Sequence, residues 1–159
     1  MPFELQINLS QLDSFAARMG GFDQRLRRAL VRAITRATLL VEARAKQLVS
    51  GEVLKVRTGT LRRSISHRPI EQLADRVRGV VSASAKYARI HELGGEIRPV
   101  RARALRFQVE GRWVTVQRVR MPERSYLRRA LRESGGQIRA EIRQAVREAA
   151  AFGGGSVEV

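Results

Sequence analysis

An apolar face, repeated at helical spacing through residues 22–48, constrains the fold of this chain more than any other feature. It consists of Phe22, Leu26, Leu30, Ala33, Ile34, Ala37, Leu40, Val41 and Leu48. Spacings of three and four residues place these side chains on one side of a long amphipathic helix. Asp23 lies in the predicted first turn, where the helix dipole favours a carboxylate, and Gly51 is expected to end the helix.

A second apolar face at helical spacing follows Pro122. It consists of Tyr126, Leu127, Leu131, Ile138, Ile142, Ala145, Val146 and Ala149. We expect Pro122 to open this helix, because the first helical turn leaves unbonded the N–H that proline lacks. Gly135 and Gly136 interrupt the helix at a cost of about 1 kcal/mol each relative to alanine. A kink or a break is therefore expected there.

Alternation of apolar and polar residues predicts strands in the rest of the chain. The sequence places them at residues 3–9, 66–70, 76–84, 104–109 and 113–119. The last two flank a turn at 110–112 and make the clearest predicted hairpin. Residues 71–75 are expected to form a polar turn, and Ser10 to cap a short helix that ends at Gly20–Gly21.

These elements predict an α+β fold, in which a small, mostly antiparallel sheet with a β-hairpin packs against a long N-terminal helix and a C-terminal helix. With 159 residues in total, the chain is expected to form a single domain over residues 1–152. Residues 153–159 begin with Gly-Gly-Gly-Ser and are expected to be a flexible tail.

The composition argues against several classes of protein. Because the chain has no cysteine, neither a disulfide framework nor a thiolate metal site is expected. No apolar run approaches the roughly 20 residues that a membrane span needs, and the N-terminus lacks the pattern of a signal peptide. We therefore expect a soluble protein of intracellular origin with no membrane partner.

The net charge of +16 is the unusual number in the composition. Such a charge indicates a polyanionic partner, nucleic acid first of all. Of the 31 basic residues, only Lys46, Lys55 and Lys86 are lysine. Codon usage in a GC-rich genome explains this bias, and so do the bidentate contacts of arginine with carboxylates and phosphates. Because no nucleic-acid-binding motif accompanies the charge, the charge alone does not identify the partner.

Arg25, Arg28, Arg32 and Arg36 form a basic stripe on another face of the long helix. A solvated helix face is the favoured interpretation of such a stripe, and a track for nucleic acid is the less favoured one. In an oligomer the stripe would equally suit the carboxylates of a neighbouring subunit.

His91 and Glu92 are adjacent and suggest a catalytic pair, but the sequence does not complete a catalytic site. Position 95, where a zinc-protease motif needs its second histidine, is Gly95. His67 stands alone in a basic strand segment, and no G-x-S-x-G motif is present. We expect His91 to hydrogen-bond within the fold or across an interface, and Glu92 to pair with an arginine. The protein is predicted not to be an enzyme and to have no metal or cofactor.

Residues 58–65 combine a glycine, hydroxyls and arginines, as a phosphate-binding loop would. The pattern G-x-x-x-x-G-K-[ST] and its strand–loop–helix context are missing, which argues against a nucleotide site. Instead we expect a turn at Thr58-Gly59, a single helical turn capped by Thr60, and Leu61 and Ile65 pointing inward.

Residues 87–95 are predicted to form a short helix with an abrupt end. The side chains spaced to pack on one side of it are Tyr87, Ile90 and Leu93. Gly94 and Gly95 are expected to adopt positive φ, to end the helix and to turn the chain into an extended basic loop, residues 96–103. The basic residues of this loop are Arg98, Arg101 and Arg103.

Three motifs of the chain occur in an order typical of one family. They are Thr58-Gly59-Thr60-Leu61-Arg62-Arg63-Ser64-Ile65, Tyr87-Ala88-Arg89-Ile90-His91-Glu92-Leu93-Gly94-Gly95 and Met121-Pro122-Glu123-Arg124-Ser125-Tyr126-Leu127-Arg128-Arg129-Ala130-Leu131. The set resembles the neck and tail-completion proteins of tailed bacteriophages, which include head–tail connector, minor tail protein Z and virion-morphogenesis groups. The resemblance covers about residues 30–135. Ser125 and Tyr126 replace a proline and a phenylalanine usual in the third motif.

The resemblance implies that the motif residues serve assembly. They are Thr58, Gly59, Leu61, Ser64, Ile65, Tyr87, Ala88, His91, Glu92, Gly94, Gly95, Pro122, Tyr126 and Leu127. We expect the basic loop with Arg98, Arg101 and Arg103 to face an adjacent subunit, another virion protein or DNA.

The function that the resemblance implies is structural. Such proteins form rings at the head–tail junction, and a hexamer is expected here. The implied neighbours are tail-tube, terminator and head-connector proteins, with DNA passing through the ring. The expected location is the virion, after synthesis in the cytoplasm of the host bacterium. A non-sequence-specific DNA-binding protein is the alternative that the charge supports, while a histidine-dependent hydrolase would need a third catalytic partner beside His91.

Overall fold

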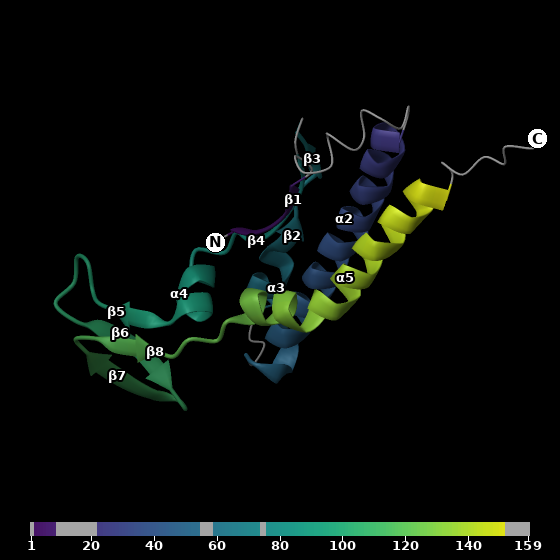
Figure 1. The fold of residues 1–159 in the computed structure, drawn as a ribbon. Helices are drawn as coiled ribbons and strands as arrows, with labels where there is room; N and C mark the ends of the chain where they lie inside the picture. Colours follow the sequence, from purple (N-terminus) through teal and green to yellow (C-terminus); the bar gives the residue numbers. More distant parts are fainter. Residues whose placement is uncertain (1, 9–21, 55–58, 74–75, 152–159) are drawn as a thin grey trace, which may run out of the picture.

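The computed structural model describes residues 2–8, 22–54, 59–73 and 76–151, which form a helical body and a projecting arm (Figure 1). Two long helices, α2 (Phe22–Gln47) and α5 (Tyr126–Ala151), lie side by side in opposite directions. A wider π-type turn, η1 (Leu48–Glu52), continues α2, and Gly51 at φ 134° ends the helix as predicted.

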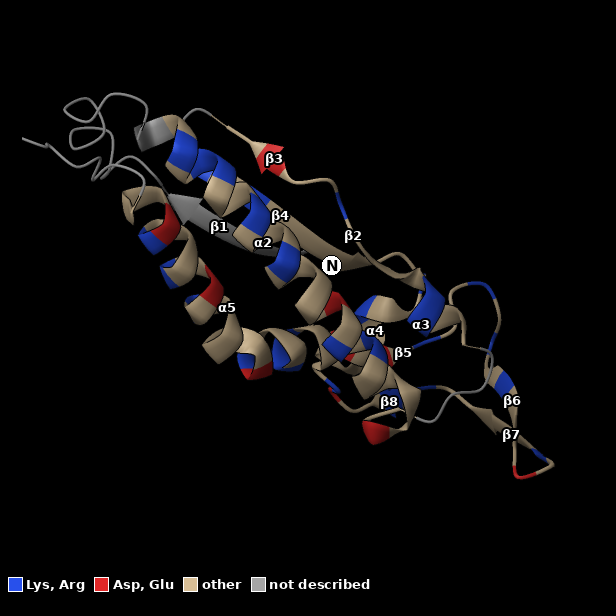
Figure 2. Cartoon of the chain, turned by 90° about the vertical axis from the view of Figure 1, so that its right-hand side faces the viewer, with Lys and Arg blue, Asp and Glu red and all other residues tan. Residues whose placement is uncertain are grey.

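A small antiparallel sheet covers α2 on the side away from α5 (Figures 1 and 2). Its central strand is β4 (Arg76–Ala83), which pairs with β1 (Pro2–Asn8) and β2 (Ile65–His67). The short strand β3 (Glu71–Gln72) also pairs with β4. This arrangement of one sheet and two helices confirms the predicted α+β class.

Two clusters of buried side chains fill the body. The main core cluster consists of Ala37, Val41, Ala45, Leu48, Val49, Ile65, Val81, Ala83, Ala88, Tyr126, Leu127, Ala130 and Ile138. The second core cluster consists of Leu26, Ala29, Leu30, Ala33, Ile34, Val77, Ala145 and Ala149. Both clusters draw on α2, so this helix is the central layer between the sheet and α5.

The sheet approaches α2 closely at Gly79 of β4. A Cβ atom at this position would lie 2.4 Å from Thr38 Cγ2 and 2.7 Å from Ile34 Cγ2. Real Cβ atoms do not tolerate such distances, so the absence of a side chain at Gly79 sets how tightly the strand lies on the helix.

The arm, residues 94–125, leads from α4 (Ala88–Leu93) to α5 and projects from the body (Figure 1). Its strands form two separate antiparallel pairs, and no residue of the arm is buried. The pairs are β5 (Gly95–Ile97) with β8 (Val119–Met121) and β6 (Leu105–Val109) with β7 (Arg112–Val116). The second pair is the predicted hairpin, whose two-residue turn has Glu110 at φ 50° and Gly111 at φ 81°. Positive φ at both positions is the backbone geometry of a tight hairpin turn.

The start of α5 differs from the prediction. The helix begins at Tyr126 rather than at Pro122, because the chain from β8 must first cross to the body. Ser125, directly before the helix, has φ 47°, which is outside the right-handed helical region. Of the kink or break predicted at Gly135–Gly136, the break is absent, since α5 is continuous over its 26 residues. Its ribbon bends after the first turns (Figure 1).

Two predicted β segments also differ in detail. β3 lies within residues 71–75, which were expected to be only a turn, and the strand predicted at 113–119 divides into β7 and β8. The division lets β8 pair with β5 instead of extending the hairpin. The helix predicted from Ser10 and the tail at 153–159 lie outside the described residues. No helix among the described residues is long and apolar enough to cross a membrane.

Candidate assembly site

The first motif forms the turn and the short helix α3 (Thr60–Ser64) that lead into β2. Thr58 lies outside the described residues. The prediction that Thr60 caps α3 is wrong, because the N-cap is Gly59 and no side chain caps this helix. Gly59 has φ 68°, a left-handed conformation that glycine adopts without strain. Its carbonyl accepts a hydrogen bond from Arg63 N at 3.0 Å.

Two side chains of the first motif reach the core, as predicted. Ile65 is fully buried in the main core cluster, and Leu61 packs against that cluster. Ser64 Oγ donates a hydrogen bond to the carbonyl of Leu61 at 2.8 Å. The carbonyl of Ser64 accepts one from Ser84 N at 3.1 Å, which ties the motif to the end of β4.

In the second motif, α4 buries a different face from the one predicted. Tyr87 is 40% exposed, and Ile90 and Leu93 are half-buried. The buried residues of α4 are Ala88, which lies in the main core cluster, and Glu92. The two are four residues apart and so share one side of the helix. That side faces the core and the N-terminus of α5, which helical spacing alone could not indicate.

The buried carboxylate of Glu92 caps the N-terminus of α5. Its Oε2 accepts a hydrogen bond from Leu127 N at 2.9 Å, and its Oε1 accepts one from Arg128 N at 3.0 Å. Arg128 Nε lies 3.5 Å from Oε1, which confirms the predicted pairing with an arginine. A helix N-terminus leaves its first N–H groups unbonded, and its dipole favours negative charge. One carboxylate therefore satisfies both requirements from a neighbouring helix.

The glycine pair after α4 brings the second and third motifs together. Gly94 and Gly95 have φ 66° and φ 136°, as predicted. A Cβ atom on Gly94 would lie 2.7 Å from Glu123 N and 3.0 Å from the carbonyl oxygen of Met121. The backbone at Pro122 therefore crosses Gly94 at a distance that leaves no room for a side chain.

Backbone hydrogen bonds complete this contact. Arg124 N donates to the carbonyl of His91 at 2.9 Å, and Ser125 N donates to the carbonyl of Glu92 at 3.1 Å. We call the resulting unit the motif junction; it consists of residues 87–95 and 121–128. The junction holds both ends of the arm at one place on the body.

All three motifs meet at the main core cluster. Tyr126 and Leu127 are buried there together with Ala88 and Ile65. The hydroxyl of Tyr126 has no hydrogen-bond partner among the described residues. Burial, and then the charge of Glu92, raise the pKa of this hydroxyl, so it stays protonated.

The side chain of His91 is partly buried. Its Nδ1 is buried, and the expected hydrogen bond of this atom is not found among the described residues. Burial, and then the charge of Arg124, lower the pKa of His91, so the ring is neutral at pH 7. The side chain of Glu92 is already engaged by α5. No group of three or more His, Asp or Glu within the described ranges could hold a metal ion.

His67, which seemed isolated in the sequence, pairs with Glu42 of α2. Its Nδ1 lies 2.5 Å from Glu42 Oε2, and its backbone N donates to the same oxygen at 3.0 Å. Lys46 Nζ lies 2.5 Å from the other oxygen. Burial alone would raise the pKa of Glu42, but the hydrogen bonds from Lys46 and His67 outweigh it and keep that pKa below its ordinary value. This cluster fastens β2 to α2.

The arginine stripe of α2 lies along the edge of the contact with α5 (Figure 2). Arg32 Nη2 lies 3.6 Å from Glu148 Oε2, and Arg36 Nε lies 2.5 Å from Glu141 Oε2. The stripe was expected to be a solvated face. Although these side chains are partly exposed, Arg32 and Arg36 meet carboxylates of their own chain.

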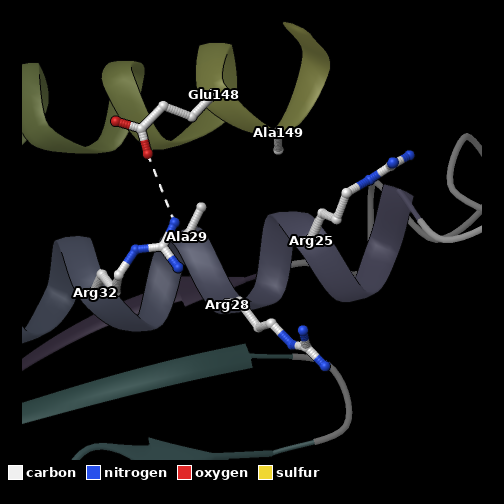
Figure 3. Close-up of a pocket in the computed structure, with 6 residues that line it drawn as sticks. All are labelled: Arg25, Arg28, Ala29, Arg32, Glu148 and Ala149. Carbon is white, nitrogen blue, oxygen red and sulfur yellow. Dashed lines mark ion pairs between the residues drawn. The ribbon is translucent and has the colours of Figure 1, made fainter. Parts of the chain in front are cut away.

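A pocket of about 340 Å³ opens at the far end of the same contact (Figure 3). It is lined by Arg25, Arg28, Ala29, Arg32, Glu148 and Ala149. The side chains of Arg25 and Arg28 point away from Glu148, whereas Arg32 points toward it (Figure 3). The pocket therefore lies between α2 and α5, at the end of their contact.

The structure places the predicted basic loop at the outer part of the arm. Arg98, Arg101 and Arg103 are exposed and lie between β5 and β6. Arg98 Nε lies 2.5 Å from Glu96 Oε1. The loop is thus separated from the buried motif residues, which hold the arm in place.

Sequence reasoning missed the aromatic side chains of the hairpin as surface features. Trp113 is 60% exposed, and the guanidinium of Arg106 lies 4.6 Å from the centre of its ring. Phe107 is 36% exposed on the opposite face of the hairpin. The alternation of residues in the two strands assigns each side chain to one of two faces. With the register set by the two-residue turn, the sequence alone would have shown which residues share each face.

Comparisons with known proteins agree with the motifs. A model of the phage virion morphogenesis family matches residues 23–151. No curated protein and no solved structure matches the chain. The family match spans α2 to α5 and includes all three motifs. This protein therefore belongs to the phage virion morphogenesis family and has a structural role in building the virion.

Proposed function

We propose that this protein is the subunit of a ring at the head–tail junction, where it completes the tail and joins it to the head around the DNA channel. The structure of the arm is the main observation that supports this proposal. Its strands form only isolated pairs, none of its residues is buried, and the motif junction holds it in place. Two-stranded sheets are only marginally stable alone, so an arm of this kind gains its stabilising contacts from neighbours.

The proposed partners are copies of the same chain and adjacent virion proteins. By analogy with the family that the motifs resemble, the ring is a hexamer, with tail-tube, terminator and head-connector proteins above and below it. Heterologous contacts between copies close such a ring. DNA passes through its centre during packaging and ejection, and the basic surface of the chain suits that environment.

Charge reversal on the basic loop tests the proposal. Arg98→Glu/Arg101→Glu/Arg103→Glu is expected to reduce head–tail joining by roughly 100-fold, because each reversed charge replaces an attraction with a repulsion. Joining is measured by counting joined particles, free heads and free tails by electron microscopy after complementation of a phage that lacks the protein. The helical signal of the purified variant should match that of the wild type, because the loop has no contact with either core cluster.

A matched control makes the same change in net charge elsewhere. Arg139, Arg143 and Arg147 are exposed on α5, and their reversal to Glu should leave more joined particles than the loop variant does. Normal joining by the loop variant would contradict the role of the loop. A purified wild-type protein that stays monomeric by light scattering at all concentrations would contradict the ring.

General DNA binding is the second candidate function. The exposed arginines of the arm and the net charge favour it. In that case isolated monomers would bind duplex DNA with an affinity that falls steeply as salt rises. Ring formation with little affinity for DNA would favour the junction role instead.

A further inference from the structure

The β6–β7 hairpin has one apolar face and one polar face. Residues opposite each other in an antiparallel pair share a face, and so do residues two apart on one strand. The register pairs Leu105 with Val116 and Phe107 with Val114. The apolar face therefore consists of Leu105, Phe107, Val109, Val114 and Val116, with Arg112 opposite Val109 at its tip. The other face consists of Arg106, Gln108, Trp113 and Thr115.

Among the described residues the apolar face is only partly covered: Leu105, Val114 and Val116 are half-buried, and Phe107 and Val109 are exposed. None of its five residues belongs to either core cluster or packs against one. Toward the tip of the hairpin, Phe107 is 36% exposed and Val109 is 46% exposed. Exposed apolar residues gathered on one face of a projecting element mark an interaction surface.

The surroundings of this face are strongly basic. The arm contains Arg98, Arg101, Arg103, Arg106, Arg112, Arg118, Arg120 and Arg124 against only Glu96, Glu110 and Glu123. Glu96 and Glu123 already pair with arginines of this chain. The surface that covers the arm must therefore supply carboxylates or phosphates.

In the part of the chain that the structure describes, a second copy has few free carboxylates to offer. Among the acidic side chains that the structure describes, only Glu110 has no hydrogen bond or ion pair, and it lies at the tip of the arm itself. The engaged carboxylates are Glu42, Glu52, Glu71, Glu92, Glu96, Glu123, Glu133, Glu141 and Glu148. To neutralise the arm with these described carboxylates, a neighbouring copy would have to break its own ion pairs.

A nucleic acid would satisfy the arginines but not the apolar face. The phosphates and sugars of a duplex give no apolar partner to Phe107 and Val109. Arginine, tryptophan and phenylalanine are enriched in protein–protein interfaces. The arm combines such residues with the cation–π contact between Arg106 and Trp113.

We propose that the arm docks on a different protein, whose surface has an apolar patch bordered by Asp and Glu side chains. The apolar face of the hairpin covers the patch, and the arginines of the loop and of β8 pair with the border. This inference rests on the proposed function, in which the arm meets another virion protein. It adds the chemistry of the partner and makes a second copy and DNA the alternative outcomes of the test.

Defined polymers test this chemistry on the full-length protein. The probes are a random copolymer of glutamate and tyrosine, poly-glutamate of similar length, and a duplex DNA of about 20 base pairs. Trp113 is the only tryptophan of the chain, so its fluorescence reports on the arm alone. At about 150 mM salt we expect the copolymer to bind about ten-fold more tightly than poly-glutamate and than DNA, because only the copolymer buries the apolar face.

Variants on each part of the surface separate the contributions. Phe107→Ser/Val109→Ser should bring the affinity for the copolymer down to that for poly-glutamate. Leu39→Ser/Val146→Ser, which changes two apolar residues of similar exposure on the helices, should leave both affinities unchanged. Arg101→Gln/Arg103→Gln leaves the strands intact and should weaken binding of both acidic polymers several-fold. If the Phe107→Ser/Val109→Ser variant unfolds the hairpin, the Arg101→Gln/Arg103→Gln variant still tests the inference.

Three outcomes would overturn the inference. One is tightest binding to the duplex DNA with a steep salt dependence, which would make nucleic acid the occupant. Another is self-association, measured by sedimentation, that the Phe107→Ser/Val109→Ser variant abolishes. The third is equal affinity of the wild type for the two acidic polymers. A wild-type protein that forms no ring but prefers the copolymer would contradict the proposed function and leave this inference standing.

Discussion

At the scale of single residues, Glu92 is the centre of the motif junction. A buried carboxylate is costly unless it is paired and hydrogen-bonded. Here two backbone N–H groups of α5 and the guanidinium of Arg128 surround it. The pairing of His91 with Glu92 in the sequence suggests acid–base chemistry, but the two side chains have separate roles. Glu92 holds α5, while His91 stands against the ring of Tyr87 with centroids 5.7 Å apart.

Replacement of Glu92 should therefore destabilise the body. Glu92→Ala leaves two buried N–H groups without an acceptor, and we expect it to lower the free energy of unfolding by about 2–4 kcal/mol. Glu92→Gln keeps one acceptor oxygen and should cost less. Urea denaturation followed by circular dichroism measures both. The exposed Glu123→Ala should change stability by no more than about 0.5 kcal/mol, and an equally small effect of Glu92→Ala would disprove the cap.

At the scale of elements, the contact between α2 and β4 depends on one missing side chain. The Cγ2 atoms of Thr38 and Ile34 occupy the space next to Gly79. The helix holds the β-branched Ile34 in one rotamer. The hydroxyl of Thr38 donates a hydrogen bond to the carbonyl of Thr35 at 2.9 Å, which fixes the rotamer of Thr38, so neither methyl group turns away. The antiparallel contact with α5 is specified differently, by small residues in the core and by ion pairs such as Arg44 with Glu133 at its edge.

Two glycine-to-alanine changes should have opposite effects. Gly79→Ala places a methyl group into Thr38 and Ile34 and should lower the free energy of unfolding by about 1–3 kcal/mol. Gly136→Ala in α5 meets nothing within 4 Å and should raise that free energy by roughly 0.5–1 kcal/mol through helix propensity. Thermal and urea denaturation of both variants measure the difference. Equal effects of the two changes would refute this account of the helix–sheet contact.

At the scale of the whole molecule, stability is divided between the body and the arm. Both core clusters lie in the body, whereas residues 94–125 have no buried side chain. Local opening is easiest where few apolar contacts resist it. The arm is thus attached at a firmly held junction but has little stability of its own.

Hydrogen exchange should reveal this division. In the isolated protein, amides of β6 and β7 are expected to exchange at least about 100-fold faster than those of β4, because the hairpin opens without disrupting a core. Mass spectrometry of peptides from the two regions gives the comparison. In assembled particles, the arm should become protected while β4 changes little. Equal protection of the two regions in the isolated protein would contradict an arm that opens independently.

Much of the fold followed from the sequence because it rests on local periodicity. The apolar face of residues 22–48, the alternation around residues 110–112 and the glycine pair at Gly94–Gly95 each specify local structure through short-range forces. These predicted the long helix, the hairpin and the end of α4. The ordered motifs predicted the family, because their residues contact one another in the fold and their order is typical of that family. The periodicity did not locate the start of α5, which depends on the path from β8 to the body.

Only the tertiary structure decided what the conspicuous residues do. Glu92 accepts hydrogen bonds from residues more than thirty positions away, and His67 pairs with Glu42 of another element. The face of α4 that is buried, and the face of the hairpin that is left uncovered, depend on which elements pack together. Side-chain periodicity specifies which residues share a face, but the partner of that face is set by long-range packing. For the arm, we propose that a partner protein supplies that packing.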